Sequence, residues 1–323
     1  MRVGEEEKIQ MNTPIHSPMN YTGGKAKILP FLLGLFPKGI HCFYDLFCGG
    51  LNVSLNVDAE LVVANDLNSR LMGIYEHIAS CATFDELDSQ IVGAIQKYKL
   101  HDTPEISLLG IPGSDVRSVS EKGYYALRDA YNEIGDPLLL LVLMFYSFNN
   151  EIRFNRQFKF NMPIGKSCYN AKNKTELEAM HYILRKRGFS FSSKSFEEFG
   201  VDTFSKGDFV YCDPPYLITN AVYNESNNDE SGWNEDTERR LYSFLDGLDA
   251  RGILFGLSNA VQNNGKTNAI LDGWMRKYKV FHPDIHYSNS SYHHTSREHD
   301  TVEVYVTNYK DAVDKRDEQI FLF

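Results

Sequence analysis

Short apolar runs alternate with amphipathic stretches along most of the chain, and this alternation predicts an α/β fold. Runs rich in β-branched and aromatic residues predict buried strands, while apolar residues at helical spacing predict the helices between them. The strands are expected at 41–47, 61–65, 189–196, 209–213, 253–259 and 301–308, and the helices at 28–36, 70–79, 84–98, 121–132, 137–146, 236–250 and 267–278. We also expect a helical stretch through Val53 and Leu55, after the turn Cys48-Gly49-Gly50.

Polar or glycine- and proline-rich segments interrupt this pattern. Residues 1–17 are expected to form a loose arm and residues 310–323 a peripheral tail. Residues 101–120 predict a surface insertion, and the acidic residues 224–232 a mobile loop. A chain of 323 residues favours one large core with a smaller module.

The composition is ordinary for a soluble globular protein, with 42% apolar and 24% charged residues. No apolar run approaches the roughly 18 residues of a membrane span, and the first ten residues are acidic rather than signal-like, so we expect a cytoplasmic protein with no membrane partner. The five cysteines form no Cys-x-x-Cys pair, which predicts neither a disulfide framework nor a zinc site. Four histidines lack acidic or thiolate partners at ligand spacing, so no metal is expected: His286, His293, His294 and His299.

Charge is distributed unevenly along the chain. The net charge is −10, but residues 151–187 contain nine basic and three acidic residues and carry +6. Aromatic and amide residues are interleaved with these bases from 147 to 170, a mixture that suits stacking on nucleic-acid bases and reading their edges. An ordinary solvated face is the alternative interpretation.

The strand that begins at Phe209 ends in Asp213-Pro214-Pro215-Tyr216. Two prolines remove backbone donors and stop the strand, which leaves a carboxylate, a free carbonyl and an aromatic ring at the carboxyl edge of the sheet. Ligands bind at that edge in open α/β folds. The alternative is that the prolines merely end a core strand and Asp213 caps the turn.

Two other strands also end in carboxylates. Asp45 precedes the glycine turn after the first strand, and Asp66 follows the second, where it could accept both ribose hydroxyls. The glycine pair before Lys25 suits close approach of a polar ligand. The three-glycine dinucleotide fingerprint is absent, so the pattern favours S-adenosylmethionine (AdoMet) over NAD.

Taken in order, these motifs resemble the Dam-type DNA adenine-N6 methyltransferases of the D12 class with the alpha motif order, and most of all the Dam enzymes of T-even bacteriophages. The resemblance covers residues 18–309 and is strongest at 45–51, 136–140 and 208–219. It implies an AdoMet-dependent, Rossmann-like mixed sheet with a mostly helical target-recognition domain inserted. The catalytic domain would comprise 18–68 and 188–309, and the recognition domain 69–187.

The resemblance also assigns roles to residues. It implies AdoMet contacts from Tyr21, Lys25, Asp45, Phe47, Gly49, Asp66, Ser195 and Phe196, and catalysis by Asp213, Pro214 and Tyr216. It implies DNA contacts from Phe148 as a duplex wedge, Asn149 as partner of the orphaned thymine, Arg153 as a guanine reader and Pro163 at a thymine methyl. The DNA-binding set further includes Asn20, Glu151, Asn155 and Lys166. Asn20 and Glu151 depart from the GATC-reading pattern, so the site is GATC or a related short sequence.

The implied activity is methyl transfer from AdoMet to the N6 amine of a flipped adenine in double-stranded DNA, without metal, by a monomer or weak dimer of a restriction–modification or bacteriophage system. Three alternatives remain open. One is a methyltransferase for RNA or protein glutamine, and another is a cytosine-N4 enzyme, which usually has serine in place of Asp213. The third is a catalytically silent DNA-binding regulator with the same fold.

Overall fold

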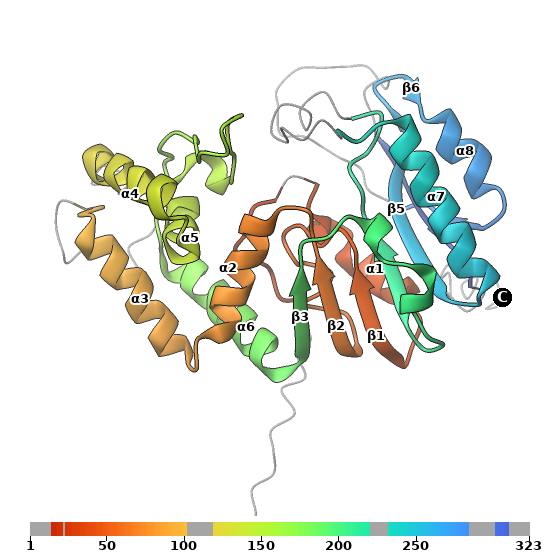
Figure 1. Cartoon of the computed structure of the whole chain (residues 1–323), viewed down its shortest axis with the longest axis horizontal. Helices are drawn as coiled ribbons and strands as arrows, with labels where there is room; N and C mark the ends of the chain where they lie inside the picture. Colours follow the sequence, from red (N-terminus) through yellow and green to blue (C-terminus); the bar gives the residue numbers. More distant parts are fainter. Residues whose placement is uncertain (1–13, 22, 102–118, 220–231, 284–300, 310–323) are drawn as a thin grey trace, which may run out of the picture.

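A computed structural model describes residues 14–21, 23–101, 119–219, 232–283 and 301–309 (Figure 1). Most of the predicted arm, the tail, the insertion and the acidic loop lie outside these residues. The four histidines considered as metal ligands, from 286 to 299, also lie outside them. In the described part of the chain, no helix is long and apolar enough to cross a membrane.

A single mixed sheet forms the centre of the described chain, as the sequence predicts. Its strand order is β3-β2-β1-β4-β5-β8-β7, and β6 pairs with β5. The five strands β3, β2, β1, β4 and β5 are parallel, whereas β8 runs antiparallel to both β5 and β7. Their bounds are β1 Ile40–Asp45, β2 Ala59–Asn65, β3 Gly188–Ser192, β4 Phe209–Cys212, β5 Leu254–Asn263, β6 Lys266–Thr267, β7 Lys279–Phe281 and β8 Val302–Thr307.

The strand order reverses at β1, which lies between β2 and β4. Asp45, the last residue of β1, is in register with Ala64 of β2 and Tyr211 of β4. A ligand crevice is expected outside the carboxyl ends of strands at such a reversal. Asp45, Asp66 and Asp213 therefore reach the same edge of the sheet from three neighbouring strands.

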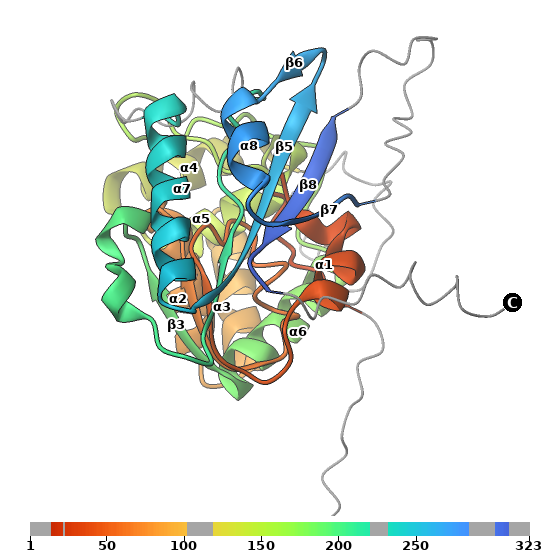
Figure 2. The same ribbon diagram turned by 90° about the vertical axis from the view of Figure 1, so that its right-hand side faces the viewer.

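Helices cover both faces of the sheet. Apolar residues of α7 and α8 pack with β4 and β5 on one face, and those of α1 pack with β1 and β4 on the other (Figure 2). The helices are α1 Leu29–Leu35, α2 Ser69–Ser80, α3 Phe84–Lys97, α4 Glu121–Ile134, α5 Pro137–Tyr146, α6 Ala171–Lys186, α7 Glu235–Ala250 and α8 Ala269–Met275. Short 3₁₀ turns lie at η1 Lys25–Lys27, η3 Phe148–Asn150, η4 Phe196–Glu198 and η5 Val201–Thr203.

The helices α3, α4 and α5 gather beside the sheet at the left of Figure 1. Their centre is α5, whose residues from Leu139 to Tyr146 are all buried. The same apolar cluster includes Leu51, Leu55 and Ala64 next to the sheet. This shared core holds the helical lobe at a fixed position relative to the carboxyl edge.

Some local predictions were wrong. Residues 52–56 form successive turns rather than a helix. The strand expected at 189–196 ends at Ser192, because Ser195 begins a 3₁₀ turn, and the helix expected from 267 begins at Ala269, because Thr267 pairs with β5. We did not predict α6, although its buried residues recur at helical spacing, because its other positions are strongly polar.

Candidate active site

The Asp213 carboxylate lies directly after β4 and pairs with Lys25. The distance from Lys25 Nζ to Asp213 Oδ1 is 2.8 Å, and the two side chains are 6% and 16% exposed. Lys25 Nζ also donates to the Gly23 carbonyl at 2.9 Å and lies 5.0 Å from the centre of the Tyr216 ring. Residues from the N-terminal glycine pair and from the Pro-Pro strand end therefore form one cluster.

Burial makes the carboxylates at this edge unusually basic. It raises the pKa of Asp213 to about 6, against the opposing effect of the Lys25 ammonium. It raises the pKa of Asp45 to about 7, and the nearby Asp213 and Asp66 charges add to that rise. The pKa of Asp66 is raised by burial as well. Three carboxyl groups in a small volume favour a ligand that brings positive charge.

The glycine turn after β1 is shaped around Asp66 and Tyr21. The Gly49 amide donates to Asp66 Oδ2 at 3.1 Å, and the Asn68 amide donates to Oδ1 at 2.9 Å. Gly49 has a φ of +43°, and a Cβ atom there would lie 2.8 Å from the Tyr21 ring. A side chain at position 49 would therefore be strained and would displace Tyr21.

The Asp45 side chain is buried and satisfied on one oxygen. Ser54 donates its hydroxyl to Oδ2 at 2.6 Å, and the Phe47 backbone also favours the ionised carboxylate, while Oδ1 lacks a hydrogen bond of good geometry among the described residues. A buried carboxylate oxygen without a donor is costly, so a ligand that supplies one would be stabilised here. The sulfonium and ammonium charges of AdoMet, together with its ribose, fit the chemistry of these carboxylates.

Asn65, the last residue of β2, connects the strand ends and was not predicted from sequence. Its Nδ2 donates to the Leu46 carbonyl at 3.0 Å and to the Lys194 carbonyl at 2.9 Å. Its Oδ1 accepts from Ser192 Oγ at 2.7 Å and from the Lys194 amide at 2.9 Å. The only local signal was an amide next to Asp66, which is also common in ordinary turns.

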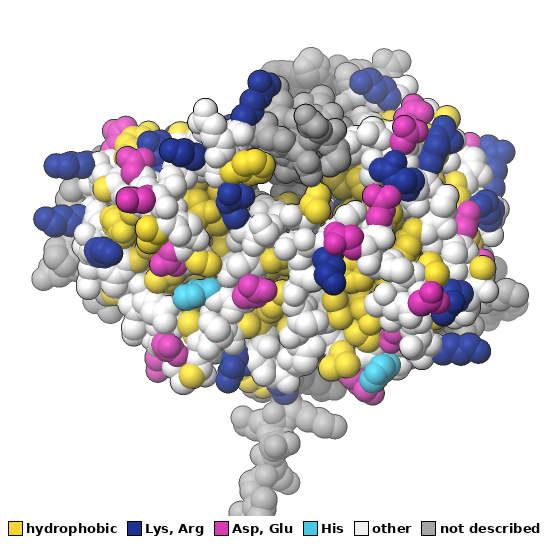
Figure 3. Space-filling model, in the orientation of Figure 1, with side chains coloured by type: hydrophobic (Ala, Val, Ile, Leu, Met, Phe, Trp, Pro, Cys, Tyr) yellow, Lys and Arg dark blue, Asp and Glu magenta, His cyan; other side chains and the backbone are white. Residues whose placement is uncertain are grey.

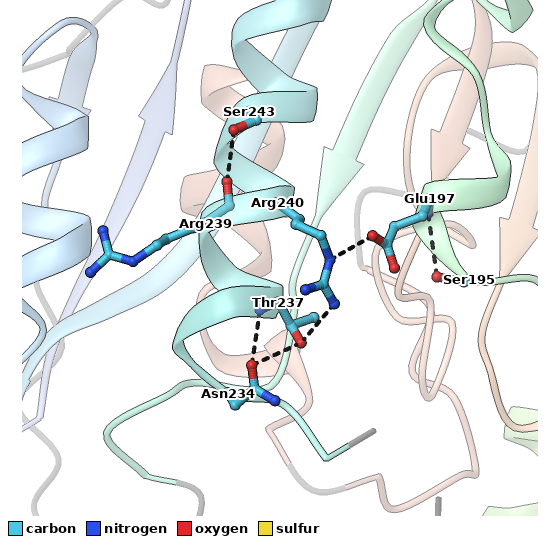
Figure 4. A network of polar contacts seen from close by, with 7 residues as sticks. All are labelled: Ser195, Glu197, Asn234, Thr237, Arg239, Arg240 and Ser243. Atoms are coloured by element: carbon cyan, nitrogen blue, oxygen red, sulfur yellow. Dashed lines mark hydrogen bonds and ion pairs between the residues drawn. The ribbon is translucent and has the colours of Figure 1, made fainter. Parts of the chain in front are cut away.

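The expected cofactor residues Phe47 and Phe196 lie together. Their ring centres are 5.9 Å apart, although the residues follow different strands. Ser195 caps the 3₁₀ turn that follows it. Its hydroxyl accepts from the Glu197 amide, and its own amide donates to the Glu198 side chain, which together form a capping box. Figure 4 shows Glu197 also reaching the Arg240 side chain of α7, with 2.6 Å between Oε1 and Nε.

The expected DNA-binding residues lie within the 147–170 segment, except Asn20, which contacts its start. Asn20 donates its side-chain amide to the Asn149 carbonyl at 2.8 Å. Phe148 is 49% exposed, and its amide donates to the Pro163 carbonyl at 2.9 Å. Asn149 has a φ of +56°. Phe148 therefore presents an exposed ring next to a residue whose backbone lies in the left-handed region.

A hairpin-like loop follows these residues. Arg153 is exposed, and its Nε donates to Asn161 Oδ1 at 3.0 Å, which fixes the plane of the guanidinium. The Asn155 side chain instead accepts from the amides of Gln157 and Lys159, so it shapes the turn. Lys166 and Pro163 are exposed, whereas Glu151 is half-buried.

The exposed surface of this part of the molecule mixes basic and hydrophobic side chains. Figure 3 shows Lys and Arg next to hydrophobic residues, with acidic side chains among them, along the upper part of the face drawn there. Arg70 of α2 lies over the rings of Phe154 and Phe158, with 4.8 and 5.3 Å from its guanidinium carbon to the ring centres. Among the described residues, no group of three or more histidine, cysteine or acidic side chains could hold a metal ion.

Comparison with known proteins shows which family the chain matches. Residues 21–289 match the family described as D12 class N6 adenine-specific DNA methyltransferase. The chain is 36% identical to the type II methyltransferase M.FokI of Planomicrobium okeanokoites over 307 residues, which are 94% of this chain and 44% of that protein. It is 35% identical to the modification methylase StsI of Streptococcus sanguinis over 300 residues, or 92% of this chain and 43% of that protein.

A third relative is closer to the chain in length. The DNA adenine methylase of Escherichia coli is 27% identical over 248 residues, which are 75% of this chain and 79% of that protein. By contrast, the chain spans less than half the length of the first two relatives.

Proposed function

Since the chain belongs to the D12 class N6 adenine-specific DNA methyltransferase family, we propose that it transfers a methyl group from AdoMet to the N6 amine of adenine in duplex DNA. The observation that carries this proposal is the Asp213 carboxylate, paired with Lys25 at the edge of the sheet beside Asp45 and Asp66. Site residues from four separate parts of the chain meet there.

The reaction explains why these residue types are needed. The exocyclic amine of adenine is a poor nucleophile, because its lone pair is delocalised into the ring. The Asp213 carboxylate and the Pro214 carbonyl can accept the two amine hydrogens and draw the nitrogen toward tetrahedral geometry. Neither group carries a donor that would compete. The Tyr216 ring can stack on a base that has left the duplex.

The cofactor would be held by residues from all three strand ends. When bound, AdoMet supplies the electrophilic methyl group of its sulfonium. Asp66 would accept the ribose hydroxyls, and Asp45 Oδ1 would accept from a donor of the ligand. Phe47 and Phe196 would contact the adenine ring. Holding amine and methyl in line would supply much of the acceleration.

The recognition surface would be the segment around Phe148 and Arg153. Phe148 is exposed and would enter the duplex, and Arg153, whose guanidinium is held by Asn161, would read a base edge. The half-buried Glu151 would rather accept from a cytosine amine than contact a thymine methyl, which favours a short site other than GATC. Base flipping, this site and the domain limits 18–68, 69–187 and 188–309 are all parts of the proposal.

Several finer expectations stay predictions. These are a special likeness to bacteriophage Dam enzymes, a role in restriction–modification, a cytoplasmic location and a monomeric or weakly dimeric state. The relatives named above are bacterial methylases, among them a type II enzyme. Their named activities favour a modification enzyme over a silent regulator.

The proposal is tested by offering the purified chain radiolabelled AdoMet with duplex DNA of mixed sequence, structured RNA or protein. We expect label in duplex DNA, and none with an Asp213→Ala variant. Label in RNA or protein would favour the corresponding alternative. Label in none of the three would contradict the enzymatic proposal, provided that the wild type is folded by circular dichroism.

A further inference from the structure

Trp233 packs against the proposed cofactor residues Phe47 and Phe196, and these three rings form an aromatic corner. Its ring centre lies 5.6 Å from that of Phe47, at an interplanar angle of 83°, and 6.1 Å from that of Phe196. Phe47 follows β1, Phe196 follows β3, and Trp233 directly precedes the N-cap of α7. Three segments distant in sequence thus bring aromatic rings together at the carboxyl edge of the sheet.

The corner lies next to the proposed ribose acceptor. Phe47 is two residues before Gly49, whose amide donates to Asp66. Phe196 is two residues after Lys194, whose amide and carbonyl both bond to Asn65, the neighbour of Asp66. The rings therefore stand close to where an adenine would extend from a ribose held by Asp66.

The Trp233 indole is fixed from behind by a buried carboxylate. Its Nε1 donates to Glu238 Oε2 at 3.1 Å, and Glu238 is 0% exposed. Glu238 Oε1 also accepts from the side chains of three further residues, Tyr242, Asn259 and Asn268. A carboxylate that is itself bound by three donors, from α7, β5 and the α8 N-cap, holds the indole in one orientation.

A second contact ties the two sides of the corner together. The Arg240–Glu197 pair joins α7 to the turn that begins with Phe196, and Asn234, the residue after Trp233, caps α7 by accepting from Thr237 (Figure 4). Both side chains of the ion pair are about half exposed, so its contribution to stability is small. The pair nevertheless connects the turn that carries Phe196 with the helix that follows Trp233.

We infer that Trp233 is a cofactor-binding residue, whose indole forms one wall of the pocket for the adenine ring of AdoMet. This inference rests on the proposed function. It adds a residue from beyond Asp213-Pro214-Pro215-Tyr216 to a set that otherwise comes from the ends of β1, β2 and β3 and from the N-terminal glycine pair. An immobilised indole stacks on a purine without losing rotamer entropy upon binding.

The chain offers a built-in probe, because it contains two tryptophans. Trp274 stacks on Tyr242, with ring centres 4.4 Å apart, and donates to Asp246. A Trp274→Phe variant leaves Trp233 as the single indole fluorophore and keeps an aromatic ring against Tyr242. Because Tyr242 donates to Glu238, the control is that this variant binds S-adenosylhomocysteine with wild-type affinity by calorimetry. We expect titration with S-adenosylhomocysteine or adenosine to change its fluorescence saturably, and methionine to leave it unchanged.

Two further variants measure the contribution to affinity. Trp233→Leu should weaken S-adenosylhomocysteine binding about tenfold, as expected for the loss of one stacking partner, whereas Trp233→Phe should weaken it less, and both should keep the wild-type circular dichroism spectrum. Calorimetry of S-adenosylhomocysteine binding to the wild type distinguishes a failure of the Trp233 inference from a failure of the proposed function. Wild-type binding that Trp233→Leu leaves unchanged, with no fluorescence response to adenosine, would overturn this inference alone. No binding to the wild type would contradict the proposed function itself.

Discussion

Replacing Lys25 by methionine removes the ammonium that lies 2.8 Å from Asp213 while keeping most of the side-chain volume. The Asp213 pKa, already raised to about 6, loses its main opposing influence. An opposite charge at this range typically lowers a carboxyl pKa by about 1–3 units, so the pKa should rise to roughly 8 in the variant. The ionised fraction at pH 7 would then fall from about nine-tenths to about one-tenth.

Only the carboxylate form of Asp213 is expected both to accept a hydrogen bond from the amine and to stabilise the positive charge that develops on its nitrogen. The rate of transfer should therefore follow the ionised fraction of Asp213. We expect single-turnover methylation by Lys25→Met, at saturating AdoMet and DNA, to be about tenfold slower than wild type at pH 7 and to recover at pH 9 or above. Lys38→Met, which removes an exposed lysine, should keep the wild-type profile. An acid limb that stays near pH 6 in Lys25→Met, or a loss of rate that is equal at every pH, would show that Lys25 does not control the ionisation of Asp213.

Three further predictions follow from the site. Asp213→Ala should abolish transfer yet keep AdoMet affinity within about tenfold by calorimetry; a larger loss of affinity would assign Asp213 to cofactor binding instead. Arg153→Ala should cost roughly 1–3 kcal/mol in discrimination at one base pair, and Asn161→Leu part of that, measured on duplexes substituted at each position; unchanged preference would remove Arg153 from the readers. Burial raises the pKa of Asp45 to about 7, so the folded state holds its proton more tightly than the unfolded state, and stability should fall as pH rises from about 4 to 7. Asp45→Asn should therefore raise the thermal midpoint of the ligand-free protein more at pH 8 than at pH 5, and an equal effect at both would contradict the shift.

The parts of the fold that sequence predicted are those with local signals. The strands β1 and β4 are short apolar runs that stop at turn signals, Gly49 after β1 and Pro214-Pro215 after β4. The helices α3 and α7 show apolar periodicity, α5 is apolar along its whole length, and all three start at capping residues. Such signals lie within a few residues of the element they define, so the chain alone reveals them.

The features that sequence missed depend on contacts between distant residues. Asn65 bonds to Lys194, 129 positions away, and Trp233 reaches Phe47 across the sheet edge. Nothing near these residues distinguishes them from an ordinary turn amide or core indole. Ser195 shows the opposite case, because its predicted ligand role coincides with a capping box that the local sequence Ser-Phe-Glu-Glu already indicates.

The activity proposed for this chain is methylation of adenine at N6 in DNA. The most direct test is to express the chain and its Asp213→Ala variant in cells without adenine methylation, and to analyse the genomic DNA by nucleoside mass spectrometry and by sequencing that maps methylated bases. We expect N6-methyladenine at one short recurring sequence with the wild type and none with the variant. Methylated cytosine, or DNA without methylation from a folded wild-type chain, would contradict it.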